Sequence, residues 1–136
     1  MSKARNPIMS MLDIHRLYCQ RFLNQLEEIQ QNLPKIQQDE SAYELELLFD
    51  SFNRECQQNL TRLIKQKEDE EQFQLFKQLE IICNHIHQLT PPLTKMKKND
   101  LTSEQVNNYF DDQERFIDIV QNHLHDLNNF LYSSPN

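Results

Sequence analysis

The sequence predicts an all-α fold, an antiparallel four-helix bundle that runs up-down-up-down. Two observations carry this prediction. Glycine is absent from the 136 residues, although an average chain of this length would contain about nine or ten. Without glycine the favoured two-residue hairpin turns are lost, which disfavours β-rich folds. Apolar residues also recur at alternating steps of three and four, the spacing of one helix face. The alternative is three helices, of which one is long and bent.

The first predicted helix covers residues 8–33. Pro7 suits its start, because a first helical position leaves its backbone N–H unbonded in any case. Pro34 ends it, because an interior proline crowds the preceding turn. Its heptad seam consists of Ile8, Leu12, His15, Cys19, Phe22, Leu26, Ile29 and Leu33.

The second and third predicted helices cover residues 41–66 and 69–89. Their apolar patterns differ in phase, and Asp69 with Gln72 has the spacing of an N-cap and its partner. We therefore expect a turn near residues 66–69. Pro91 and Pro92 are predicted to stop the third helix, so that residues 90–102 form the longest linker.

The fourth predicted helix covers residues 103–131, and Thr102 with Gln105 has the capping-box spacing. Its main seam consists of Val106, Phe110, Gln113, Ile117, Val120, Leu124, Leu127 and Leu131. A second stripe lies beside it, at Tyr109, Phe116, His123 and Phe130. A bundle helix uses about three positions per heptad, so this stripe is expected in the core. If part of it is exposed, it becomes a docking or self-association face.

The composition excludes several classes of chemistry in this single domain of residues 1–136. A chain without glycine has no glycine-rich phosphate loop and no serine-nucleophile elbow of the usual kind. The net charge of −7 disfavours generic binding to nucleic-acid backbones. The carboxylates fall almost entirely off the apolar seams, and the three cysteines fall on or beside them. We therefore expect no enzyme activity and no cofactor.

Two groups of residues raise the question of a metal site. In CNHIHQLTPP (83–92), His85 and His87 point about 200° apart around a helix, so we interpret this segment as an ordinary helix end. His15 and Cys19 are four residues apart on one face, and antiparallel packing would bring His123 to the same level. A metal site at His15, Cys19 and His123 is the weaker alternative to a hydrogen-bonded core histidine beside a buried thiol.

Surface features favour a protein partner. The N-terminal half of the first helix is apolar nearly all round, more than a bundle interior can cover. Acidic residues gather in the first halves of the second and fourth helices, and we expect them to form one acidic cap for a partner with a basic patch. The predicted contact residues are Met11, Ile14, Leu17, Tyr18, Tyr109, Phe116, Glu44, Asp111 and Asp112.

The segments FNRECQQNLTRLIKQ (52–66) and LFKQLEIICNHIHQL (75–89) resemble the PriC replication-restart proteins in their helical leucine spacing. This resemblance covers about a third of the chain and implies an accessory role in nucleic-acid metabolism. Lys95, Lys97 and Lys98 in the predicted long linker are a separate observation that favours the same role. The chain departs from that family because it is acidic and lacks a basic C-terminal helix. In size, acidity and glutamine-rich helices it also resembles bacterial secretion chaperones. No residue role is transferred from either family.

The sequence therefore predicts a non-catalytic protein-protein interaction module, such as an adaptor, chaperone, inhibitor or secreted effector. The alternatives are the nucleic-acid accessory role and a metal-binding helical bundle. A homo-oligomer is a further arrangement to consider. The three cysteines, an odd number, fit reduced thiols, and no apolar run reaches the length of a membrane helix. We expect a cytoplasmic protein, or one that a secretion system delivers into a host cell, with no membrane partner.

Overall fold

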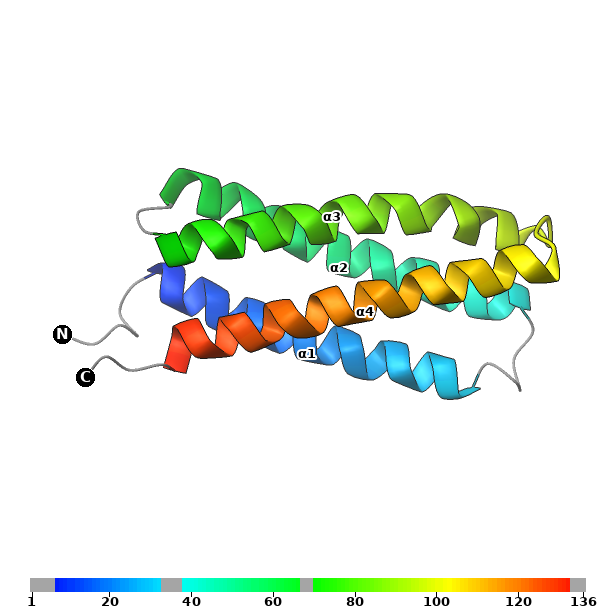
Figure 1. Ribbon diagram of the computed structural model, residues 1–136, viewed down its shortest axis with the longest axis horizontal. Helices are drawn as coiled ribbons and strands as arrows, with labels where there is room; N and C mark the ends of the chain where they lie inside the picture. Colours follow the sequence, from blue (N-terminus) through cyan, green and yellow to red (C-terminus); the bar gives the residue numbers. More distant parts are fainter. Residues whose placement is uncertain (1–6, 33–37, 67–69, 133–136) are drawn as a thin grey trace.

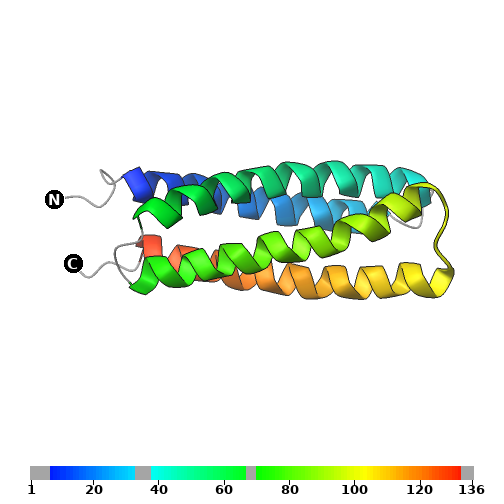
Figure 2. The same cartoon turned by 90° about the horizontal axis from the view of Figure 1, so that it is seen from above.

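A computed structural model describes residues 7–32, 38–66 and 70–132. These residues form four long helices, α1 (Pro7–Asn32), α2 (Gln38–Gln66), α3 (Glu70–Lys97) and α4 (Ser103–Tyr132). The helices lie lengthwise beside one another and alternate in direction (Figures 1 and 2). The predicted four-helix bundle is thereby confirmed. None of the helices in the described ranges is long and apolar enough to cross a membrane.

Each helix packs mainly against two neighbours: α1 contacts α2 and α4, and α3 contacts the same two helices. The pairs α1 and α3, and α2 and α4, therefore occupy diagonal corners. Because α2 and α3 run antiparallel and pack against each other, the alternative of one long bent helix is wrong. Asp69, the predicted N-cap, lies outside the described residues.

The third helix continues through its two prolines, so the predicted end at residue 89 and the long 90–102 linker are wrong. Leu89, Leu93 and Met96 are all buried and extend the core face of α3 beyond Pro91. Each fully buried side chain of this size stabilises the fold by about 1.5–3 kcal/mol. The cost of an interior proline is about 3 kcal/mol or more. Burial of this last turn and a half offsets much of that cost.

The start of α4 agrees with the predicted capping box. The backbone N–H of Gln105 donates to Thr102 Oγ1 at 3.2 Å, and the backbone N–H of Thr102 donates to Gln105 Oε1 at 2.9 Å. Two N–H groups that the first helical turn leaves unpaired are satisfied by this exchange.

The inward face of α4 differs from the predicted main seam. Its buried residues are Val106, Tyr109, Gln113, Phe116, Val120, His123 and Leu127. The predicted seam members Phe110, Ile117 and Leu124 are only partly buried. The stripe through Tyr109, Phe116 and His123 thus points inward, because α4 contacts both α1 and α3 and its central line falls between them. Tyr109 and Phe116 are core residues, and the prediction that they contribute a partner surface is wrong.

An aromatic cluster holds the middle of the bundle together. The Phe22 ring stacks on Phe52 with centroids 4.1 Å apart, and Phe49 and Phe116 pack against Phe22 at 5.4 Å and 5.9 Å. These rings join α1, α2 and α4 next to a group of polar side chains.

Candidate functional site

Seven polar or thiol side chains from all four helices meet at one level of the core, and we refer to them as the polar layer. They are His15, Cys19, Glu55, Asn59, Gln78, His123 and Asp126. His15, Cys19 and His123 are fully buried. A buried polar group is costly unless it is hydrogen-bonded, so the partners of each atom matter.

His15 lies at the centre of the polar layer. Its Nδ1 atom lies 2.7 Å from Glu55 Oε1, and its Nε2 atom lies 3.0 Å from His123 Nε2. Cys19 Sγ, one helical turn away, is 3.5 Å from the same Nε2 atom. Asn59 Nδ2 donates to the second oxygen of Glu55, which holds the carboxylate in place. Since a carboxylate only accepts hydrogen bonds, the proton between His15 and Glu55 is on Nδ1.

The ring of His123, on α4, is oriented in the same way by a residue of α3. Its Nδ1 atom lies 2.8 Å from Gln78 Oε1. The amide nitrogen of Gln78 donates to the carboxylate of Asp126, which aims the amide oxygen at the ring. His123 therefore carries its proton on Nδ1, and its Nε2 lone pair faces His15.

The two histidines have opposite protonation tendencies. Burial disfavours a charged His15, but the interactions with Cys19 and Glu55 outweigh burial and raise its pKa to about 10. Burial and the neighbouring His15 charge hold the pKa of His123 well below its usual value. These opposite pKa shifts favour a protonated His15 that donates from Nε2 to the neutral His123.

The three cysteines are buried, free thiols. Burial raises the pKa of Cys56 well above its ordinary value, and burial together with Glu80 raises that of Cys83 to about 11. Neither thiol has the exposed, electropositive setting of a nucleophile.

On the outer side of α1, the predicted partner surface is only partly present. Ile14, Leu17 and Tyr18 are 55%, 54% and 43% exposed. Met11 is 7% exposed and belongs to the core, so its prediction as a contact residue is wrong. Met11 is three residues before Ile14 and seven before Tyr18, so it lies on nearly the same side of α1. The exposed surface therefore ends before Met11, which packs in the core.

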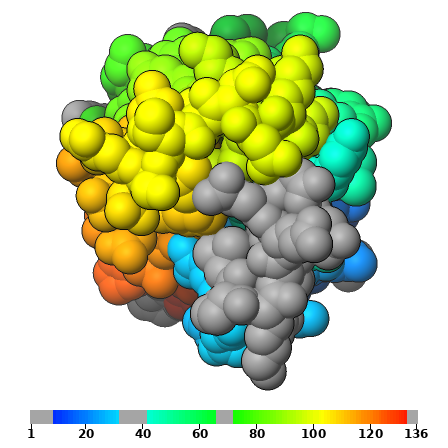
Figure 3. Space-filling model, turned by 90° about the vertical axis from the view of Figure 1, so that its right-hand side faces the viewer, coloured from blue at the N-terminus to red at the C-terminus, as the bar shows by residue number. Residues whose placement is uncertain are grey.

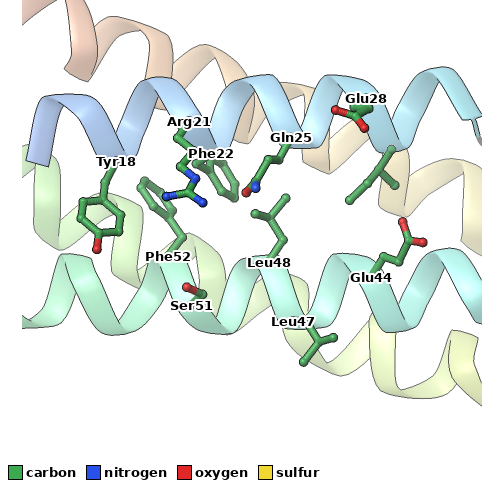
Figure 4. Close-up of a pocket in the computed structure, with 11 residues that line it drawn as sticks. Tyr18, Arg21, Phe22, Gln25, Glu28, Glu44, Leu47, Leu48, Ser51 and Phe52 are labelled. Carbon is green, nitrogen blue, oxygen red and sulfur yellow. The ribbon is translucent and has the colours of Figure 1, made fainter.

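A groove of about 590 Å³ runs between α1 and α2, beside this exposed surface. Figure 4 shows Tyr18 and Arg21 reaching from α1 toward α2, and Phe52 reaching from α2 toward α1 beside them. Phe22, Leu48 and Phe52 contribute apolar surface to its floor. Its polar residues are Arg21, Gln25, Glu28, Glu44 and Ser51, and Leu47, 70% exposed, lies at its α2 edge.

The acidic residues do not form a purely acidic cap. The starts of α2 and α4 do lie at one end of the bundle, which Figure 3 views directly, and the α3–α4 corner covers much of it. Lys97 of that corner pairs with Glu46 at 2.6 Å and lies over the Tyr43 ring. Exposed Asp111 and Asp112 are on α4, diagonally across from Glu44 on α2. The predicted cap is therefore interrupted by Lys97, and its acidic residues on α2 and α4 lie on different corners of the bundle.

The His85 and His87 segment is the interior of α3 rather than the predicted helix end. His85 is partly buried and stacks on Phe116 with centroids 6.1 Å apart, and His87 is exposed. Neither belongs to a group of metal-ligating atoms among the described residues.

Sequence reasoning placed His15, Cys19 and His123 at one level but missed Glu55, Gln78 and Asp126, which orient the two rings. The available signal was a polar residue at the same height in every helix. No protein-family model, curated protein or solved structure matches this chain.

Proposed function

We propose that this protein acts by binding another protein, with the groove between α1 and α2 and the apolar surface beside it as the contact face. The observation that carries the proposal is the exposure of Ile14, Leu17 and Tyr18 on one side of α1. Ile14 and Tyr18 are four residues apart, so their side chains are neighbours along the helix. Leu47 adds an exposed apolar side chain across the groove.

The shape of this face suits an amphipathic helix of the partner. The groove is open and lies between the antiparallel helices α1 and α2. Buried aromatic rings form its floor, and charged residues lie along its rims. A partner helix can bury apolar anchors against Phe22 and Phe52 while its polar residues meet Arg21 and Glu44. A reducing compartment such as the cytoplasm would suit the three free thiols.

The test compares surface variants in affinity capture from the native lysate. Leu17→Asp with Tyr18→Asp should abolish recovery of the stoichiometric partner, because both changes place charge on the contact face. Helicity and melting temperature should stay close to wild type, since both side chains are exposed.

The matched control is Ile81→Asp, which makes the same kind of change at a 46% exposed site on α3. This variant should capture the same partner as the wild type. Undiminished capture by the double variant, or equal loss in the control, would rule out the proposed face.

A further inference from the structure

Three atoms that can ligate a metal converge in the polar layer, namely the Nε2 atoms of His15 and His123 and the Sγ atom of Cys19. The Nδ1–H groups of His15 and His123 are both committed to acceptors, so loss of the Nε2 proton of His15 leaves each ring with its Nε2 lone pair turned inward. These two Nε2 atoms are 3.0 Å apart, and Cys19 Sγ is 3.5 Å from one of them. Two facing lone pairs repel unless a proton or a cation lies between them.

From this geometry we propose that His15, Cys19 and His123 bind one Zn²⁺-class metal ion, a site that goes beyond the protein-binding face. Imidazole and thiolate are the ligands that Zn²⁺ takes up most readily, and Mg²⁺ and Ca²⁺ prefer oxygen. The three ligand atoms already lie within 4.8 Å of one another.

Two of the three distances between ligand atoms match tetrahedral coordination with small adjustments, and the third, between Cys19 Sγ and His123 Nε2, is within 4.8 Å. Two nitrogens bound to Zn²⁺ at about 2.0–2.1 Å stand about 3.3–3.4 Å apart, and a thiolate at about 2.3 Å stands about 3.6 Å from each of them. The corresponding distances are 3.0 Å for the two nitrogens and 3.5 Å for Cys19 Sγ and His15 Nε2. An ion would separate the rings by a few tenths of an ångström.

Both histidines also have the partners that metal-ligating histidines use. Such a ring donates its other N–H to a carboxylate or carbonyl oxygen, which fixes the tautomer and the ring orientation. Glu55 does this for His15, and Gln78, itself held by Asp126, does it for His123. Both rings are therefore held with Nδ1 protonated and with Nε2 directed at the third ligand atom, as binding through Nε2 requires.

Charge balance favours a divalent ion. With both histidines neutral and Cys19 deprotonated by the ion, Cys19, Glu55 and Asp126 contribute three negative charges to the polar layer. A Zn²⁺ ion would offset two of these charges and a monovalent ion only one, and uncompensated charge is costly away from water.

The test uses Co²⁺, which binds to Zn²⁺ sites and whose absorption spectrum depends on the ligand atoms. Protein is stripped with a chelator under reducing conditions and titrated with Co²⁺. We expect saturation at one equivalent, visible d–d bands, and a near-ultraviolet charge-transfer band from a thiolate. Excess Zn²⁺ should displace the Co²⁺ and abolish these bands. Wild-type protein without the charge-transfer band would overturn the proposal.

Variants identify the ligands. The double variant Cys56→Ser with Cys83→Ser leaves Cys19 as the only thiol and should retain the charge-transfer band, whereas Cys19→Ser should lose it. Cys56 is the informative comparison, because its Sγ atom forms a second group of candidate ligand atoms with His15 and Glu55. Loss of the band in the double variant would show that Cys19 is not the ligand.

Two further variants separate the ligand set from general packing. Glu55→Gln should weaken Co²⁺ binding by about 10–100-fold, because the neutral amide orients His15 less well. His125→Gln changes an exposed histidine two residues from His123 and should leave binding unchanged. Equal affinity in Glu55→Gln and wild type would contradict the assigned role of Glu55.

Discussion

His15 on α1 and His123 on α4 face each other with their Nε2 atoms 3.0 Å apart, although 108 positions separate them in the sequence. Their rings meet edge to face, with centroids 5.1 Å apart. The pair ties the first helix to the last within a core that is otherwise largely apolar. Because neither ring reaches solvent, any cation at this point has to be bound by the protein itself.

The inward stripe of α4 should dominate the mutational sensitivity of that helix. Phe116 is fully buried against Phe22 and Phe49. We expect Phe116→Ala to lower the free energy of unfolding by about 3–5 kcal/mol, measured by chemical denaturation. Leu47→Ala, at a 70% exposed position, should change it by no more than about 0.5 kcal/mol. Similar small effects at both positions would show that Phe116 is not in the core.

Pro91 should be a destabilising residue that the fold tolerates. Its side chain is exposed and it lies inside α3. Replacing it with alanine restores a helical N–H and removes a ring clash, while the unfolded chain gains conformational freedom. We expect Pro91→Ala to raise the free energy of unfolding by about 2 kcal/mol. Leu93→Ala should lower it by about 2–5 kcal/mol. A loss of stability in Pro91→Ala would mean that proline rigidity stabilises this turn.

Tyr109 should make the protein sensitive to alkali. Burial raises the pKa of Tyr109 above its ordinary value of 10, so the unfolded chain loses this proton at a lower pH than the folded protein. Its contribution to the free energy of unfolding is therefore complete below pH 10 and is lost as the pH rises above it. The free energy of unfolding, measured by chemical denaturation at several pH values above 10, should fall less steeply with pH for Tyr109→Phe than for wild type.

The comparison for this pH effect is Tyr43→Phe, because Tyr43 is 57% exposed. That variant should follow the wild-type curve. If Tyr109→Phe also followed it, ionisation of Tyr109 would not contribute to alkaline unfolding.

The native thiols should react slowly. Cys83 is only 3% exposed, and burial and Glu80 raise its pKa to about 11. Because the thiolate, and not the thiol, attacks the disulfide bond of the reagent, we expect labelling of Cys83 at neutral pH to wait for local or global opening. Labelling followed by mass spectrometry should show complete reaction only in denaturant. Ser51→Cys, at an exposed site in α2, should react at once. Fast native labelling of Cys83 would contradict its buried position.

The sequence by itself determined the fold class, the number of helices and the start of α4. These features depend on local chemistry, namely the three-and-four apolar spacing, the absence of glycine and the reciprocal hydrogen bonds of Thr102 and Gln105. It also placed His15 and His123 at one level, since residues at known distances from the ends of antiparallel helices have a calculable height.

Only the tertiary structure decided which face of each helix points into the core and which hydrogen-bond partner each buried polar side chain has. Two adjacent stripes on α4 are both apolar in sequence, and only simultaneous packing against α1 and α3 brings Tyr109 and Phe116 inward. Burial of Leu93 and Met96 likewise carries α3 past its prolines. Glu55 and Gln78 became partners of the histidines because helix rotation and register, which depend on all four helices together, brought them within hydrogen-bonding distance.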